Sequence, residues 1–176
     1  MPEQYNTAII AKVEHEIKTI LDGDNLKHAL DFINHMTAIG MTLEMDYHPT
    51  FTYLGEWVCL LVYPKDGTNP SYFGICSWPG ELDVMENVSF PIDENLKNFA
   101  KANVKKCFHC GGCEGSDYPG PLKKMVFGKE YDDVCCNAFH FFNSSNEEME
   151  NAKKLMELLK HIIADTKQST KDVHRK

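Results

Sequence analysis

The segment Trp57-Val-Cys-Leu-Leu-Val-Tyr63 is apolar at every position, and it decides the predicted fold. A short apolar run of this kind is typical of a central strand that is covered on both faces. Residues 64–70 follow with dense turn chemistry, including two prolines and a glycine. They lead into 72–78, which we expect to be a strand antiparallel to the first. The two strands place Cys59 and Cys76 in the sheet, where a free cysteine behaves as a small hydrophobe.

On the N-terminal side, residues 41–47 alternate between apolar and polar side chains, which predicts a half-buried strand. A further short strand is expected at 51–54. Ahead of these strands, helical spacing of apolar residues predicts a helix over 8–21 and a second helix from Asp24 to Gly40. We interpret Asp22-Gly-Asp24 as the junction between these helices, because a calcium loop would need more oxygen ligands at regular spacing.

On the C-terminal side, Asp93 is expected to cap a short helix, and residues 125–131 resemble a hairpin with a two-residue glycine turn, Gly128-Lys129. Residues 134–142 are compatible with a strand or a helical turn. Ser144 and Ser145, with acidic residues three positions later, predict the capped start of a last helix. The whole pattern predicts a single α+β domain over 1–165, with helices packed on an antiparallel sheet, followed by a flexible polar tail at 166–176.

Composition and charge narrow the range of functions. The 176 residues include 18 basic and 26 acidic side chains, so the net charge is −8. This balance disfavours nucleic-acid binding, which relies on a basic surface. The chain shows no secretory signal and no apolar run long enough to span a membrane. We therefore expect a cytoplasmic location, where reduced cysteines favour metal or redox chemistry over structural disulfides.

The cysteines concentrate in one stretch of the chain. Five of the seven fall within 107–136, beginning with Cys107-Phe-His-Cys-Gly-Gly-Cys113. Cysteines separated by two residues and followed by glycine can turn onto one metal ion. The sequence therefore predicts a structural zinc site in a loop of about 105–140. Its expected ligands are Cys107, Cys110, Cys113 and Cys135, with Cys136 or His140 as alternatives to Cys135.

Other uses of these cysteines stay open. An iron–sulfur cluster has three cysteines at these gaps, and Cys135 would be its distant fourth ligand. The thiols could also lie close together without a metal. A thioredoxin-like exchange site is disfavoured, because its Cys-x-x-Cys motif opens a helix, whereas here Gly111 and Gly112 follow.

Aromatic residues supply a second functional indication. They crowd the predicted strands, and most are expected to be core. Trp57 and Trp78, with Tyr53 and Tyr72 nearby, could instead line an apolar pocket with polar handles. No nucleophile elbow, phosphate-binding loop or dinucleotide fingerprint is present, so no catalytic residue is identified.

The C-terminal half resembles uncharacterised small bacterial proteins. The resemblance covers about 70 residues, and it is carried by Cys107-x-x-Cys110-Gly111, the Gly128–Tyr131 turn, Val134-Cys135 and the closing helix. It implies no particular activity. We expect a non-enzymatic cytoplasmic domain with a structural zinc site that binds a small molecule or a protein partner through its aromatic sheet. The alternative is a metal- or redox-dependent enzyme, or a redox sensor, that uses an iron–sulfur cluster or a reactive cysteine.

Overall fold

A computed structural model describes residues 2–64, 69, 72–77, 90–107 and 121–173. The helices in this part of the chain are α1 (Pro2–Ile20), α2 (Gly23–Ala38), α3 (Glu94–Ala102) and α4 (Asn146–Val173). The strands are β1 (Thr42–Met45), β2 (Pro49–Tyr53), β3 (Glu56–Val62), β4 (Gly74–Ser77), β5 (Val104–Lys106), β6 (Leu122–Val126) and β7 (Lys129–Phe142).

The strands form one antiparallel sheet in the order β1-β2-β3-β4-β7-β5. Strand β6 pairs with β7 outside this path. Val134 is the register partner of both Lys106 in β5 and Leu122 in β6, so these two strands flank β7 on opposite sides. The long strand β7 therefore forms a hairpin with β6 through its first half and pairs with β4 through its second half. This confirms the predicted α+β fold with an antiparallel sheet.

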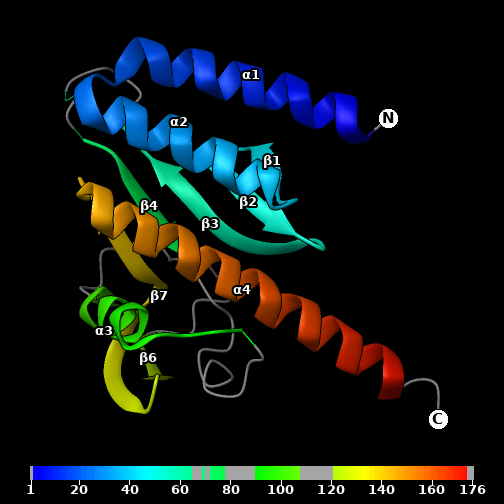
Figure 1. Cartoon of the computed structure of the whole chain (residues 1–176), viewed down its shortest axis with the longest axis vertical. Coiled ribbons are helices and arrows are strands. Elements are labelled where there is room, and N and C mark those ends of the chain that lie inside the picture. The colour runs from blue at the N-terminus through cyan, green and yellow to red at the C-terminus, as the bar shows by residue number, and fades with distance from the viewer. Residues whose placement is uncertain (1, 65–68, 70–71, 78–89, 108–120, 174–176) are drawn as a thin grey trace.

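The helices cover one face of the sheet (Figure 1).

Helices α2 and α4 run in the same direction, as the order of the contacts between them shows. Asp31 binds Lys153 at 2.7 Å, and His35 contacts Glu157 at 2.6 Å one turn further along both helices. Lys153 is nearly buried between two carboxylates. The seam is therefore polar and charged along its edge, while the core lies beneath it.

The core fills the space between these helices and the sheet. Apolar positions at helical spacing on α1, α2 and α4 meet alternate residues of the strands. The ring of Phe32 on α2, for example, packs edge-on against Phe51 on β2 at 6.0 Å. The largest fully buried side chains are Phe32, Phe51, Phe139, Ile17, Ile33, Met36, Met41, Leu43, Leu61 and Ile75.

Two tight hairpins set the register of the strands. Leu54 and Gly55 connect β2 to β3, and both have positive φ angles, 51° and 78°. Phe127 and Gly128 connect β6 to β7 with φ angles of 46° and 74°. Paired positive φ values are the signature of two-residue type I′ turns, whose twist matches that of the strands. The predicted hairpin at 125–131 is confirmed, but its turn lies one residue earlier than expected, because Lys129 already pairs with Val126.

Three further expectations concern the apolar run at 57–63, the segment 134–142 and the C-terminal tail. The apolar run at 57–63 does form a central strand, although Leu60 and Val62 are only half-buried while Val58, Cys59 and Leu61 are buried. The ambiguous segment 134–142 is a strand. Helix α4 continues to Val173 and so includes most of the segment expected to be a flexible tail. None of the helices in the described part of the chain has the length and apolar character needed to cross a membrane.

Candidate functional site

The two faces of β4 differ in chemistry. Ile75 and Ser77 point into the core with their partners Phe141 and Phe139 on β7. Cys76 points to the opposite face, where its register partners are Leu60 on β3 and His140 on β7. Since side chains alternate along a strand, one thiol and one imidazole share the face that lies away from the helices.

Cys135 and Lys105 lie near Cys76 on this face. Burial raises the pKa of the Cys76 thiol to about 12, the neighbouring Cys135 adds to the increase, and Lys105 opposes it. These two electrostatic effects come from a residue of β7 and a residue of β5. Cys76 is therefore a protonated thiol at neutral pH.

Cys107 joins the same region at the end of β5. Its backbone N–H donates to the carbonyl oxygen of Asp133 at 2.6 Å, which extends the pairing of Lys106 with Val134. Cys107 directly follows Lys106, and Cys135 directly follows Val134, the register partner of Lys106. Neither Cys107 nor Cys135 forms a disulfide, and both residues are half-buried. We call Cys76, Cys107 and Cys135 the sulfur cluster.

The structure tests the predicted zinc ligands only in part. It places Cys107 directly after β5 and Cys135 in the neighbouring strand β7, although the two residues are far apart in the sequence. Cys110 and Cys113 lie outside the described residues. Within residues 2–64, 69, 72–77, 90–107 and 121–173, no three histidine, cysteine or acidic side chains form a group that could hold a metal ion. The described residues thus contribute two thiols, which suit zinc chemically but do not complete a site.

Cys136 departs from the expectation of reduced cysteines. It is disulfide-bonded, and since no other described cysteine forms a disulfide, its partner lies outside the described residues. A disulfide sulfur carries no negative charge and is not a thiolate ligand. Sequence reasoning missed the bond because close cysteines are equally compatible with a metal site and with a disulfide.

Among the aromatic residues predicted to line a pocket, Tyr53 and Trp57 lie on different faces of the sheet. Tyr53 lies on the helix-covered face, where the Lys160 ammonium of α4 sits 5.0 Å from its ring centre. Trp57 pairs with Thr52 and so occupies the other face. Tyr72 stacks on Phe142 at 5.3 Å, and Trp78 lies outside the described residues. Among the described side chains, Trp57 and Tyr72 are therefore candidates for one binding surface, and Trp78 stays a prediction.

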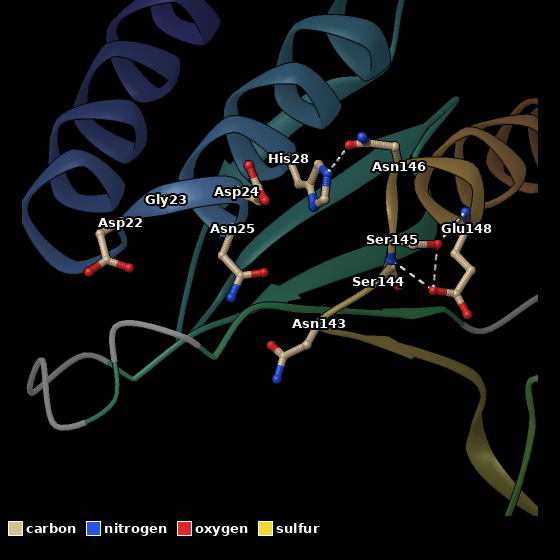
Figure 2. A pocket seen from close by; sticks show the side chains of 10 residues that line it. All are labelled: Asp22, Gly23, Asp24, Asn25, His28, Asn143, Ser144, Ser145, Asn146 and Glu148. Carbon is tan, nitrogen blue, oxygen red and sulfur yellow. Dashed lines mark hydrogen bonds between the residues drawn. The ribbon is translucent and has the colours of Figure 1, made fainter.

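A polar depression lies elsewhere, where the first turns of α2 and α4 meet the end of β7 (Figure 2). Its volume is about 660 Å³. Its lining is composed of polar side chains and one glycine: Asp22, Gly23, Asp24, Asn25, His28, Asn143, Ser144, Ser145, Asn146 and Glu148. Such a lining suits a hydrophilic molecule.

Most polar groups around the depression have structural tasks. Nε2 of His28 contacts Oδ1 of Asn146 at 2.7 Å and ties α2 to α4, as Figure 2 shows. The Glu148 carboxylate accepts hydrogen bonds from the backbone N–H and the hydroxyl of Ser145, at 2.7 and 2.9 Å, which forms the predicted capping box. The amide oxygen of Asn143 accepts from the N–H of Phe73 at 3.0 Å.

The depression was not predicted. Its two halves, residues 22–28 and 143–148, read in the sequence as two separate helix starts. Only the parallel packing of α2 and α4 brings them together. Asp22 precedes α2 without a side-chain capping bond, and its exposed carboxylate faces solvent at this edge. The arrangement can hydrogen-bond a hydrophilic ligand.

Neither a protein-family model, nor a curated protein, nor a solved structure matches the chain. The functional argument therefore rests on the residues and their arrangement.

Proposed function

We propose that this chain is a non-enzymatic binding domain whose cysteine-rich segment is held by a zinc ion. The observation that supports the proposal is the position of Cys107 and Cys135, which directly follow the paired residues Lys106 of β5 and Val134 of β7. The segment between them in the sequence supplies Cys110 and Cys113, the remaining proposed ligands. A closed four-ligand zinc site has no open coordination position, so it would serve structure and not catalysis.

Stability measurements with matched cysteine variants test the zinc proposal. Metal binding to a segment that does not order itself adds to the free energy of folding. We expect Cys107→Ser and Cys110→Ser to lower the melting temperature of the zinc-loaded protein more than Cys59→Ser does. Cys59 is a suitable control, because it is a free thiol buried in the core.

Elemental analysis gives the second measurement. We expect about one zinc ion per reduced chain, and a loss of zinc in Cys107→Ser and Cys135→Ser but not in Cys59→Ser. A brown protein that contains iron and sulfide would replace the zinc proposal with the iron–sulfur alternative. A reduced protein that binds neither metal would contradict both.

The binding surface that we propose is the sheet face opposite the helices. Trp57 is half-buried there, and the stacked pair of Tyr72 and Phe142 lies on the same face. Aromatic rings of this kind bind apolar groups while their polar atoms remain available. We expect an apolar ligand or protein partner to change tryptophan fluorescence, and Trp57→Phe to reduce that change. A hydrophilic ligand would instead be affected by substitutions in the polar depression, such as Asn143→Asp.

The alternative function, a redox sensor with a reactive cysteine, also has a specific observation in its favour. The disulfide at Cys136 lies beside Cys135 in the sequence, and Cys135 forms no disulfide. A thiol next to a disulfide is the arrangement that exchange chemistry requires. Counting free thiols before and after mild reduction separates this alternative from a purely structural zinc site.

A further inference from the structure

We infer that the polar depression binds an uncharged molecule that carries several hydroxyl groups, such as a monosaccharide. This site differs from the aromatic sheet face of the proposed function. Its lining comes from the start of α2, the residues that follow β7 and the start of α4 (Figure 2). Its volume of about 660 Å³ lies within the range of about 300–1,000 Å³ that is usual for small-molecule sites.

Three polar groups of the lining are not used by hydrogen bonds within the described part of the chain. Asp22 precedes α2, but its carboxylate does not cap the helix. The Ser144 hydroxyl takes no part in the capping box, which begins at Ser145. The side-chain oxygen of Asn143 accepts from Phe73, which leaves the two N–H donors of the same amide for a ligand. The lining therefore offers both acceptors and donors.

The depression is held in shape by hydrogen bonds between the elements that line it. His28 of α2 contacts Asn146 of α4 at 2.7 Å. The backbone N–H of Asn143 donates to the carbonyl oxygen of Phe73 at 2.8 Å, in addition to the side-chain bond between these residues. Asn143 has a φ angle of 49°, which asparagine adopts more readily than most residues. Groups that are already fixed in place lower the entropic cost of binding.

One buried atom of the lining lacks a partner. Nδ1 of His28 is buried and has no hydrogen-bond partner among the described residues. When Nε2 of His28 donates to Asn146, Nδ1 is left as an acceptor. Buried polar atoms without a partner are rare, and a bound water or ligand commonly supplies the missing contact. A hydroxyl group is a donor of the required kind.

The charges around the depression favour a neutral ligand. Its described lining contains three carboxylates and no lysine or arginine, so it repels a phosphate or a carboxylate. The starts of two helices carry partial positive charge, which opposes a cation. Asp24 is already paired with Lys27 at 2.9 Å. A hydroxyl group, by contrast, can donate to Asp22 and accept from Asn143 without carrying a charge.

The experiment titrates the full chain with glucose, ribose and myo-inositol and follows the backbone amide signals by NMR. Inorganic phosphate and spermidine serve as the anionic and cationic comparisons. We expect at least one of the three polyols to shift the signals of residues 143–146 with a dissociation constant in the millimolar range. The absence of a shift with all three would overturn the inference. A larger shift of these signals by phosphate or spermidine would also overturn it.

Matched substitutions assign the binding to the depression. We expect Asp22→Ala and Ser144→Ala to weaken polyol binding by about fivefold to tenfold, because each removes one hydrogen-bonding group. Asp165→Ala and Ser169→Ala remove a carboxylate and a hydroxyl at the other end of α4, and they should leave the affinity unchanged. Thermal unfolding without ligand checks that each variant is folded. Equal affinity in all four variants would overturn the inference and leave the proposed function intact.

Discussion

The two faces of the sheet differ at strands β4 and β7. One face carries buried core side chains, and the other carries a thiol, an imidazole and a partly exposed ring. On the helix-covered face, Ile75 meets Phe141 and Ser77 meets Phe139. On the other face, Cys76 meets His140 and Gly74 meets Phe142. The two sets are offset by a single residue, because side-chain direction alternates along a strand. Substitutions that differ by one position should therefore affect different properties.

The largest expected effect is the loss of a core ring. Phe139 is fully buried, whereas Phe142 on the opposite face is 36% exposed. We expect Phe139→Ala to lower the free energy of unfolding by about 3–5 kcal/mol, because a cavity replaces a packed ring. Phe142→Ala should cost clearly less. Chemical denaturation measures both, and similar losses would contradict the assignment of one face as core.

A second test concerns the contact between Gly74 and Phe142 on the outer face. A Cβ added to Gly74 would lie 1.9 Å from the Phe142 ring. The ring must therefore move from its position, and we expect Gly74→Ala to destabilise the protein by about 1–3 kcal/mol. In the Phe142→Ala background the same substitution should be much less harmful. An unchanged cost in that background would mean that the ring is not the obstacle.

A third test uses alkaline pH. Burial raises the pKa of the Cys76 thiol from 9.0 to about 12. Below pH 9 the thiol is protonated in both the folded and the unfolded chain, so its full contribution to stability is present. Between pH 9 and 12 only the unfolded chain loses this proton, so stability should fall by about 1.4 kcal/mol per pH unit for one such group. Burial also raises the pKa of Cys59, which adds to the loss.

Denaturation midpoints measured between pH 8 and 10.5 test this expectation. The unaltered chain should lose stability as the pH rises, and Cys76→Ala should show a shallower decline. If both chains declined with the same slope, the Cys76 thiol would not be protected from ionisation in the folded state.

The smallest expected effect lies at the start of α4, the helix that covers the core face. The Ser145 hydroxyl and the Glu148 carboxylate form a capping box. We expect Ser145→Ala to cost about 1 kcal/mol of stability and Ser144→Ala to cost almost nothing. Thermal unfolding measures both. Thiol reactivity of Cys107 and Cys135 should stay the same in both variants, since the cap lies away from the sulfur cluster.

The fold could be predicted where neighbouring residues carry the signal. Helical spacing indicated α1, α2 and α4, and the capping residues Asp93 and Ser145 marked helix starts that the structure contains. The apolar run around Leu61 indicated the central strand. Prediction was less successful for β7, because its long bent course serves three partner strands, and partners distant in the sequence leave no local pattern.

The candidate sites were less predictable than the fold. The spacing of Cys107, Cys110 and Cys113 indicated a sulfur-rich site, but not that Cys135 would come within electrostatic range of Cys76. That proximity depends on the pairing of β4 with β7. The four aromatic residues were grouped by sequence proximity, and Tyr53 was separated from Trp57 by the alternation of side chains across the β2–β3 hairpin.

The sequence by itself determined the helices, most of the strands, the acidic charge and the clustering of cysteines, since each depends on residue type and local spacing. Only the tertiary structure decided that Cys135 comes within electrostatic range of Cys76, that Cys136 is disulfide-bonded, and that the starts of α2 and α4 enclose a polar depression. The physical reason is the distance along the chain over which each interaction acts. Periodicity and capping act within a few residues, whereas strand register and helix packing join segments that the chain separates widely.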